Sequence, residues 1–176
     1  MLGYCCVPCE EDAGRYASVI AAIAKAQGAP VFLPHLTLGT LEEAPSGLAG
    51  VIEALRGLVL RPTEIDGTDV FTKSFFVRFE ATDALLSARE RLEQLPEFHP
   101  GRAFDPHMSL CYGPPPAAFR VDPEVLALLD RPVRFDRLVA LKTTLPVETY
   151  ADVAGWAVTG QYEIPPLTET GAPQNG

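Results

Sequence analysis

Hydrophobic and polar positions alternate along this chain with two periods, one typical of helices and the other of strands. Apolar residues recur at spacings of three and four over four segments, which predicts helices at 12–27, 48–58, 83–95 and 122–129. Period-two alternation or short apolar runs predict strands at 31–39, 60–69, 74–81, 104–112, 133–143 and 156–164. Several of these strands follow one another without an intervening helix, so the sheet cannot be purely parallel. We predict an α+β fold with mostly antiparallel sheets.

The periodic segments occupy most of the chain and end before its last residues. Because 176 residues are typical of a single domain, residues 1–164 are predicted to form one domain. From 165 to 176 the composition shifts to Pro, Thr, Gly and Asn, which predicts a loose C-terminal tail.

A short repeat lies within two of the predicted strands. Residues 34–39 are Pro-His-Leu-Thr-Leu-Gly, and residues 106–110 are Pro-His-Met-Ser-Leu. Side chains alternate between the two faces of a strand, so His35 and Thr37 share one face while the aliphatic residues beside them face the core. His107 and Ser109 share a face in the same way. Each copy is therefore expected to present one imidazole and one hydroxyl on a polar face.

Two such strands side by side would bring these four side chains into one cleft. The set suits phosphodiester hydrolysis, because one neutral imidazole takes a proton from water while one imidazolium gives a proton to the leaving oxygen. The hydroxyls donate hydrogen bonds to the oxygens on which charge develops. No metal or other cofactor is needed. His35, His107, Thr37 and Ser109 are our candidate catalytic residues.

With this motif the chain resembles a known family. The pattern His-x-Ser/Thr-apolar, once in each half of a chain, is the signature of the 2H phosphoesterases, whose fold is called LigT-like. The chain is most similar to the plant and yeast cyclic nucleotide phosphodiesterases, over 31–38, 104–113 and 135–144. The resemblance implies a two-lobed fold with a pseudo-two-fold axis and a central cleft. It also implies hydrolysis of 2′,3′-cyclic nucleotides or ADP-ribose 1″,2″-cyclic phosphate to monophosphates, with His107 as base and His35 as acid.

The same resemblance implies that aromatic side chains bind the substrate base. Tyr112 and Phe71 match two of the family's aromatic positions, and a third, a tryptophan on the N-terminal strand, is absent here. Strict alternation places Tyr112 on the face opposite His107, so it reaches the cleft only if the strand bends before Gly113. Trp156 begins a predicted strand and is expected in the core.

Charge bears on the choice between phosphate substrates. The formal net charge is −9, whereas proteins that coat nucleic acid need a basic face, so the substrate is expected to be small and not a long nucleic acid. Two alternatives stay open: an RNA-end 2′-5′ ligase or terminal cyclic phosphodiesterase, and a nucleotide-binding module without activity. The charge argues against the first, and the two complete motifs argue against the second.

The cell compartment is predicted from the N-terminus and the cysteines. The first residues lack the basic stretch and apolar run of a signal peptide, which predicts a cytoplasmic protein. Cys5, Cys6, Cys9 and Cys111 are then expected to be reduced and mainly structural. No apolar run approaches the roughly 18 residues of a membrane helix, so we expect no membrane partner. We expect a monomer.

Overall fold

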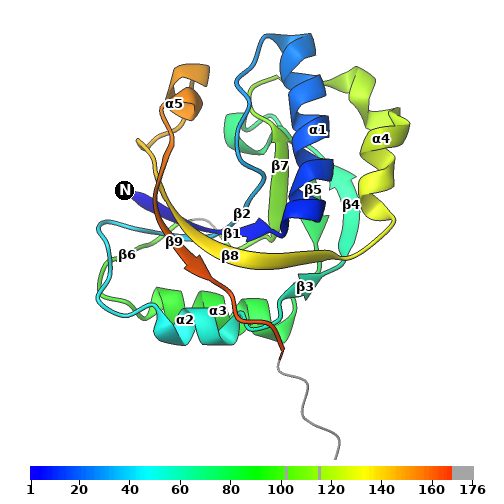
Figure 1. The fold of residues 1–176 in the computed structure, drawn as a ribbon. Coiled ribbons are helices and arrows are strands. Elements are labelled where there is room, and N and C mark those ends of the chain that lie inside the picture. Colours follow the sequence, from blue (N-terminus) through cyan, green and yellow to red (C-terminus); the bar gives the residue numbers. More distant parts are fainter. Residues whose placement is uncertain (102, 115, 168–176) are drawn as a thin grey trace, which may run out of the picture.

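The computed structural model describes residues 1–101, 103–114 and 116–167 (Figure 1). Its strands are β1 (Leu2–Pro8), β2 (Leu36–Leu41), β3 (Val59–Leu60), β4 (Pro62–Asp66), β5 (Phe75–Phe79), β6 (Phe98–His99), β7 (His107–Cys111), β8 (Val133–Lys142) and β9 (Ala157–Glu163). Its α-helices are α1 (Glu10–Gln27), α2 (Ala49–Ala54), α3 (Asp83–Glu93), α4 (Pro123–Leu126) and α5 (Tyr150–Ala154). Three short 3₁₀ helices are η1 (Phe71–Lys73), η2 (Ala117–Val121) and η3 (Ala127–Leu129).

The strands form one sheet in the order β3-β8-β1-β2-β7-β5-β4, with β9 paired to β8 and β6 to β2. The strand pairs are antiparallel. The predicted α+β class with antiparallel pairing is therefore confirmed. In the described part of the chain, no helix is both long and apolar enough to cross a membrane.

The sheet contains an internal repeat that brings the two histidine motifs together. The units β1-α1-β2 and β5-α3-β7 follow the same path, and their last strands, β2 and β7, meet in the middle of the sheet. The bridge between them joins Leu36 to Met108, the residues that follow the two histidines. Helix α1 packs against β7 and α3 against β2, so each helix covers the motif strand of the other unit. This arrangement has the pseudo-two-fold symmetry that the resemblance implies.

The hydrophobic core fixes which face of each motif strand points inward. Leu36 and Leu38 of β2 and Met108 and Leu110 of β7 are fully buried in one large cluster with the apolar faces of α1 and α3. Burying four such side chains contributes roughly 1.5–3 kcal/mol each. The alternate residues must then face away from this core, which is the predicted orientation of the motif histidines and hydroxyls.

The prolines shift the starts of the motif strands. The predicted strands 31–39 and 104–112 begin in the structure at Leu36 and His107. Pro34 and Pro106 have no N–H to donate to a sheet, so regular pairing begins only after them. His35 thus stands just before β2, and His107 is the first residue of β7. Both histidines lie at the end of a strand that the core anchors.

Other boundaries also differ from the predictions. The segment predicted as one strand over 60–69 is divided between β3 and β4, and α2 is shorter than the predicted helix at 48–58. Helix α3 is capped by the Thr82 side chain, which accepts from the Leu85 N–H. Neither β1 nor α5 is among the elements that the periodicity predicts.

The start of the predicted C-terminal tail contacts the domain. Gly57 donates its N–H to the carbonyl of Pro165 at 2.8 Å, and the Arg56 guanidinium donates to that of Pro166 at 3.2 Å. Residues 168–176 of the tail lie outside the described residues, so the predicted looseness of that part stays a prediction.

Candidate active site

The four candidate catalytic side chains line one cavity at the junction of β2 and β7. His35, Thr37, His107 and Ser109 all border this cavity, whose volume is about 220 Å³. They converge because the two motif strands are neighbours and bury their aliphatic side chains on the opposite face. The sequence prediction that the repeat places both motifs in one cleft agrees with this geometry.

Both histidine rings are held in the same way. His35 Nδ1 lies 2.6 Å from the carbonyl oxygen of Leu33, and His107 Nδ1 lies 2.7 Å from that of Asp105. A carbonyl only accepts, so each Nδ1 carries the proton in its hydrogen bond. Nε2 is then the nitrogen that is free to exchange a proton. It is a base when the ring is neutral and an acid when the ring is charged.

His35 is enclosed by aromatic rings. It is 7% exposed, and the ring of Trp156 meets it edge-on with centroids 5.8 Å apart. Phe32 approaches it in a similar way at 6.4 Å. Burial lowers the pKa of His35 from its ordinary value, and the charge of His107 lowers it further. The unliganded protein therefore favours a neutral His35 near pH 7.

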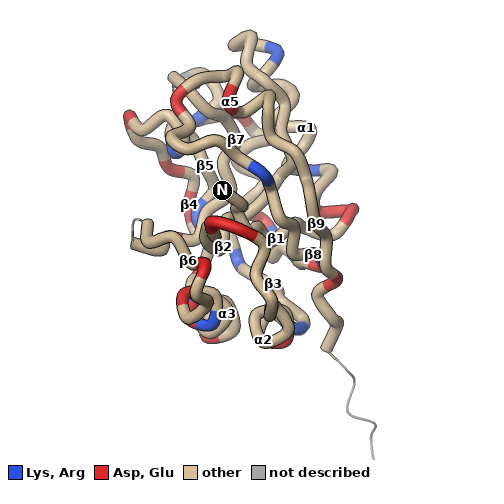
Figure 2. The backbone as a smooth tube through the Cα atoms, turned by 90° about the vertical axis from the view of Figure 1, so that its left-hand side faces the viewer, with Lys and Arg blue, Asp and Glu red and all other residues tan. Residues whose placement is uncertain are grey.

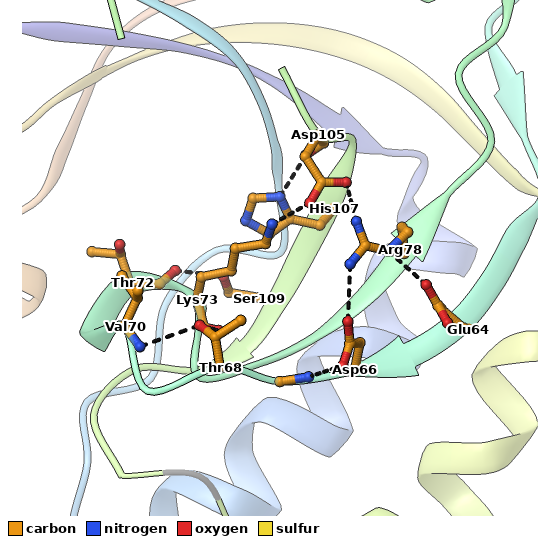
Figure 3. Close-up of polar contacts among 11 residues, drawn as sticks. Glu64, Asp66, Thr68, Val70, Thr72, Lys73, Arg78, Asp105, His107 and Ser109 are labelled. Carbon is orange, nitrogen blue, oxygen red and sulfur yellow. Dashed lines mark hydrogen bonds and ion pairs between the residues drawn. The ribbon is translucent and has the colours of Figure 1, made fainter. Parts of the chain in front are cut away.

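His107 has charged neighbours on one side and an aromatic ring on the other. Figure 3 shows Lys73 and Arg78 converging on the Asp105 carboxylate beside the His107 ring. The Phe76 ring lies 5.1 Å from the imidazole. Burial is the main cause that lowers the pKa of His107; the two cations lower it as well, while Asp105 raises it.

The two motif hydroxyls differ in exposure. Thr37 is exposed, and its hydroxyl lies 3.7 Å from Cys5 Sγ. Ser109 is buried, and its hydroxyl donates to the carbonyl of Thr72 at 3.3 Å (Figure 3). Burial raises the pKa of the Cys5 thiol to about 12, so this neighbour of Thr37 is uncharged near neutral pH.

The alternation of side chains along β7 shifts at an irregularity just before Tyr112, and the chain then bends at Gly113. Phe76 pairs with Ser109 but Phe75 pairs with Cys111, so Leu110 is an extra residue in the pairing with β5. Strand β7 ends at Cys111, Gly113 has a φ of 90°, and Tyr112 lines the cavity together with the histidines. A φ of this sign is strained for residues other than glycine. The Gly113 N–H donates to the carbonyl of Phe71 at 3.0 Å, which ties the bend to η1.

Phe71 lies outside the central cavity, next to Tyr112. The two rings are stacked with centroids 6.3 Å apart. Phe71 borders an adjoining hollow that shares Thr72, Leu145 and Val147 with the central cavity. The structure thus brings Tyr112 into the cavity itself and Phe71 into its extension.

Trp156, which the sequence analysis expects in the core, is partly buried against a small apolar cluster and also lines the candidate site. It lines the cavity beside His35 and Tyr112, with ring centroids 5.8 and 5.2 Å away. It packs against the apolar cluster that includes Cys5 and Val7 of β1, the strand on which the family's missing tryptophan is expected. Pairing of β9 with β8 and of β8 with β1 places it there, and no pattern local to Trp156 contains that information.

The cavity also has an apolar wall. Leu145 and Val147, from the segment between β8 and α5, form part of its lining. Among the described residues, no three His, Cys, Asp or Glu side chains group as a metal site. In Figure 2, acidic and basic positions are interspersed along the backbone.

Comparison with known proteins shows a clear structural likeness. No family model matches the chain, and no curated protein matches it. The crystal structure of E. coli LigT in apo form superposes with a TM-score of 0.56 at 13% sequence identity, covering 93% of this chain and 96% of LigT. The chain has the fold of LigT. The LigT-like fold that the two motifs imply is therefore confirmed, whereas the narrower similarity to cyclic nucleotide phosphodiesterases stays a prediction.

Proposed function

We propose that this protein hydrolyses small cyclic phosphodiesters, either 2′,3′-cyclic nucleotides or ADP-ribose 1″,2″-cyclic phosphate, to monophosphates without a metal ion. The observation that carries the proposal is the paired arrangement of His35 and His107. Each ring is fixed through Nδ1 by a carbonyl two residues earlier, and both rings border one cavity. The LigT fold supports a phosphoesterase or ligase type of activity.

In the proposed reaction, the cyclic phosphate lies between the two imidazoles. His107 Nε2 takes a proton from water as the water oxygen forms a bond to phosphorus. The bond from phosphorus to one ring oxygen breaks, and His35 Nε2 gives that oxygen its proton. The product is a phosphate monoester with a free hydroxyl. The two histidines end with their protonation states exchanged, and transfer of a proton through solvent restores them.

Substrate binding raises the lowered pKa values of the two histidines. Both rings favour the neutral form in the free protein, chiefly because they are buried. A phosphodiester anion between them favours the charged form of each. Since the charges of the two rings repel each other, the state expected with substrate bound has one ring protonated at Nε2 and the other neutral. That state contains one base and one acid.

The hydroxyls and aromatic rings have separate roles in this proposal. Thr37 and Ser109 donate hydrogen bonds to the phosphoryl oxygens, which gain charge in the transition state. Ser109 must turn its hydroxyl away from the Thr72 carbonyl to do so. Tyr112 and Phe71 bind the base of the substrate, with Trp156 as a further wall of the cavity.

One observation favours a second candidate, which acts on RNA ends. A hollow of about 290 Å³ adjoins the cavity at Thr37 and His107, and Lys73 and Arg89 border it. It offers room and positive charge for a further nucleotide. Both cations are already paired with carboxylates, Lys73 with Asp105 and Arg89 with Glu93, and the net charge of the chain is −9. The small substrate is therefore our first choice.

A substrate panel tests the proposal. Initial rates are measured in excess EDTA with the 2′,3′-cyclic nucleotides, ADP-ribose 1″,2″-cyclic phosphate and an RNA that ends in a cyclic phosphate. We expect turnover in EDTA, with kcat/KM at least about tenfold higher for a small substrate than for the RNA. Preference for the RNA would favour the second candidate. Absence of turnover with every substrate would contradict both.

A further inference from the structure

The two histidine motifs differ in charge at one aligned position. The first copy is Leu33-Pro34-His35 and the second is Asp105-Pro106-His107. In both, the residue two before the histidine offers its carbonyl to Nδ1, so the backbone supports the two rings equally. Only the side chains differ: one is an aliphatic group and the other is a carboxylate.

These two side chains enter opposite environments. Leu33 packs against the apolar cluster formed by Cys5, Val7, Val139 and Leu141, together with Trp156. Asp105 instead forms ion pairs with Lys73 from η1 and Arg78 from β5, as Figure 3 shows. Arg78 lies directly opposite His107 in the sheet register.

The ion pairs of Asp105 belong to a larger network that anchors it. Arg78 also contacts Asp66 at 2.9 Å and Glu64 at 2.7 Å, both on β4. Lys73 lies over the Phe76 ring at 4.9 Å from its centroid, and the same ring contacts His107. The Asp105 carboxylate thus joins β4, β5 and η1 to the short segment whose carbonyl holds the catalytic ring.

We propose that Asp105 is a positioning residue for His107. The backbone carbonyl of Asp105 fixes the His107 ring. Its carboxylate sets how strongly the positive charges of Lys73 and Arg78 disfavour a charge on that ring. The charged groups around His107 are then Lys73, Arg78, Asp105 and, across the cavity, His35. His35 has no equivalent cations among its described contacts. The residue two before each histidine, Leu33 or Asp105, therefore distinguishes His35 from His107, two otherwise equivalent acid–base groups. The role of Asp105 rests on the proposed function.

Substitutions that remove opposite charges near His107 should shift its pKa in opposite directions. Asp105→Asn keeps the shape of the side chain and the backbone carbonyl, but it leaves the two cations unneutralised beside His107. Lys73→Met removes one of those cations. Since nearby positive charge disfavours the imidazolium, we expect the His107 pKa to fall in D105N and to rise in K73M, each by roughly half a unit or more. A purely structural role predicts no such opposition.

NMR titration measures these values without any substrate. The chain has three histidines, so each ring proton signal can be assigned by substitution. His99, on β6 beside Glu42, is the internal reference. Glu64→Gln is the matched control, because Glu64 contacts Arg78 at the far end of the network but not Asp105. It should change the His107 pKa less than D105N does.

The results separate this proposal from the proposed function. Opposite shifts at His107, with His99 unchanged within about 0.2 unit, would support it. Shifts in the same direction, or none in either variant, would overturn it. If D105N fails to fold, K73M alone decides by the direction of its shift. A protein with no turnover on any substrate but opposite shifts would contradict the proposed function and leave the role of Asp105 intact.

Discussion

At the scale of single residues, the site consists of two histidines with the same backbone support and different surroundings. The hydrogen bonds of 2.6 and 2.7 Å to carbonyls give both rings the same tautomer. Aromatic rings enclose His35, while charged groups flank His107. The two rings thus share one backbone arrangement but differ in the groups that surround them.

The motif hydroxyls provide a direct test at this scale. Thr37→Val and Ser109→Ala each remove a donor that the proposed mechanism assigns to the phosphoryl oxygens. We expect kcat/KM to fall by about 100-fold in each variant, the usual effect of losing one such donor. Steady-state rates measure this. Thr159→Val on β9 is the control, since the Thr159 hydroxyl only contacts the Ala140 carbonyl. Wild-type rates in both motif variants would contradict the assignment.

The sequence predicts the motif residues better than their neighbours. His35, Thr37, His107 and Ser109 are recognisable because each pair is local and repeated. Trp156 is expected in the core from its place at a strand start, yet it lies beside His35. Its position depends on the pairing of β9, β8 and β1, which join the two ends of the chain. Hydrophobic periodicity contains no such long-range information.

At the scale of elements, close packing of a helix on a motif strand keeps the site in place. Gly39 of β2 faces α3, where a Cβ atom would lie 2.7 Å from both Arg89 Nη1 and Leu92 Cδ2. The Arg89 guanidinium also donates to the carbonyl of Leu38 at 2.6 Å. A side chain at this position would have to displace the Arg89 and Leu92 side chains, which pack between α3 and the strand that holds Thr37.

A pair of glycine substitutions tests this packing. Gly39→Ala should lower the free energy of unfolding by about 1–3 kcal/mol, the usual cost of overpacking a core. At Gly14, inside α1, an added Cβ atom would meet no neighbouring group within 4 Å. Gly14→Ala should therefore raise the free energy of unfolding by about 0.5–1 kcal/mol through helix propensity. Urea unfolding measures both. An unchanged free energy of unfolding in G39A would show that the packing of α3 on β2 accommodates the added Cβ atom without loss of stability.

Two of the elements that periodicity does not predict, β1 and α5, differ in their local signals. Helix α5 begins with a reciprocal capping box between Thr149 and Asp152, a local pattern that is present in the sequence. Strand β1 is buried along nearly its whole length, so both faces are apolar and no alternation marks it. Helix α5 was therefore predictable, whereas β1 could be told from a buried helix only through its pairing with β2 and β8.

At the scale of the whole molecule, the fold turns a sequence repeat into a pair of candidate catalytic groups. Each βαβ unit supplies one motif strand, and the two strands meet at Leu36 and Met108. The net charge of −9 does not prevent the proposed phosphate chemistry, because a phosphodiester anion in the cavity would favour the charged form of an imidazole there. It bears instead on the size of the substrate.

The most direct measurement of the two-histidine mechanism is the pH dependence of hydrolysis in EDTA by the wild type and by His35→Ala, His107→Ala and His99→Ala. The mechanism predicts a bell-shaped kcat/KM for the wild type. Its maximum should lie below pH 6.5, the ordinary pKa of histidine, because both free-protein pKa values are lowered. The maximum of kcat should lie at higher pH, since bound phosphate raises both.

In the same measurement, the His35 and His107 variants should each lose at least about 100-fold in rate, and His99→Ala should keep the wild-type rate. Circular dichroism spectra that match the wild type would show that the variants are folded. A wild-type rate in either His35→Ala or His107→Ala would contradict the two-histidine mechanism.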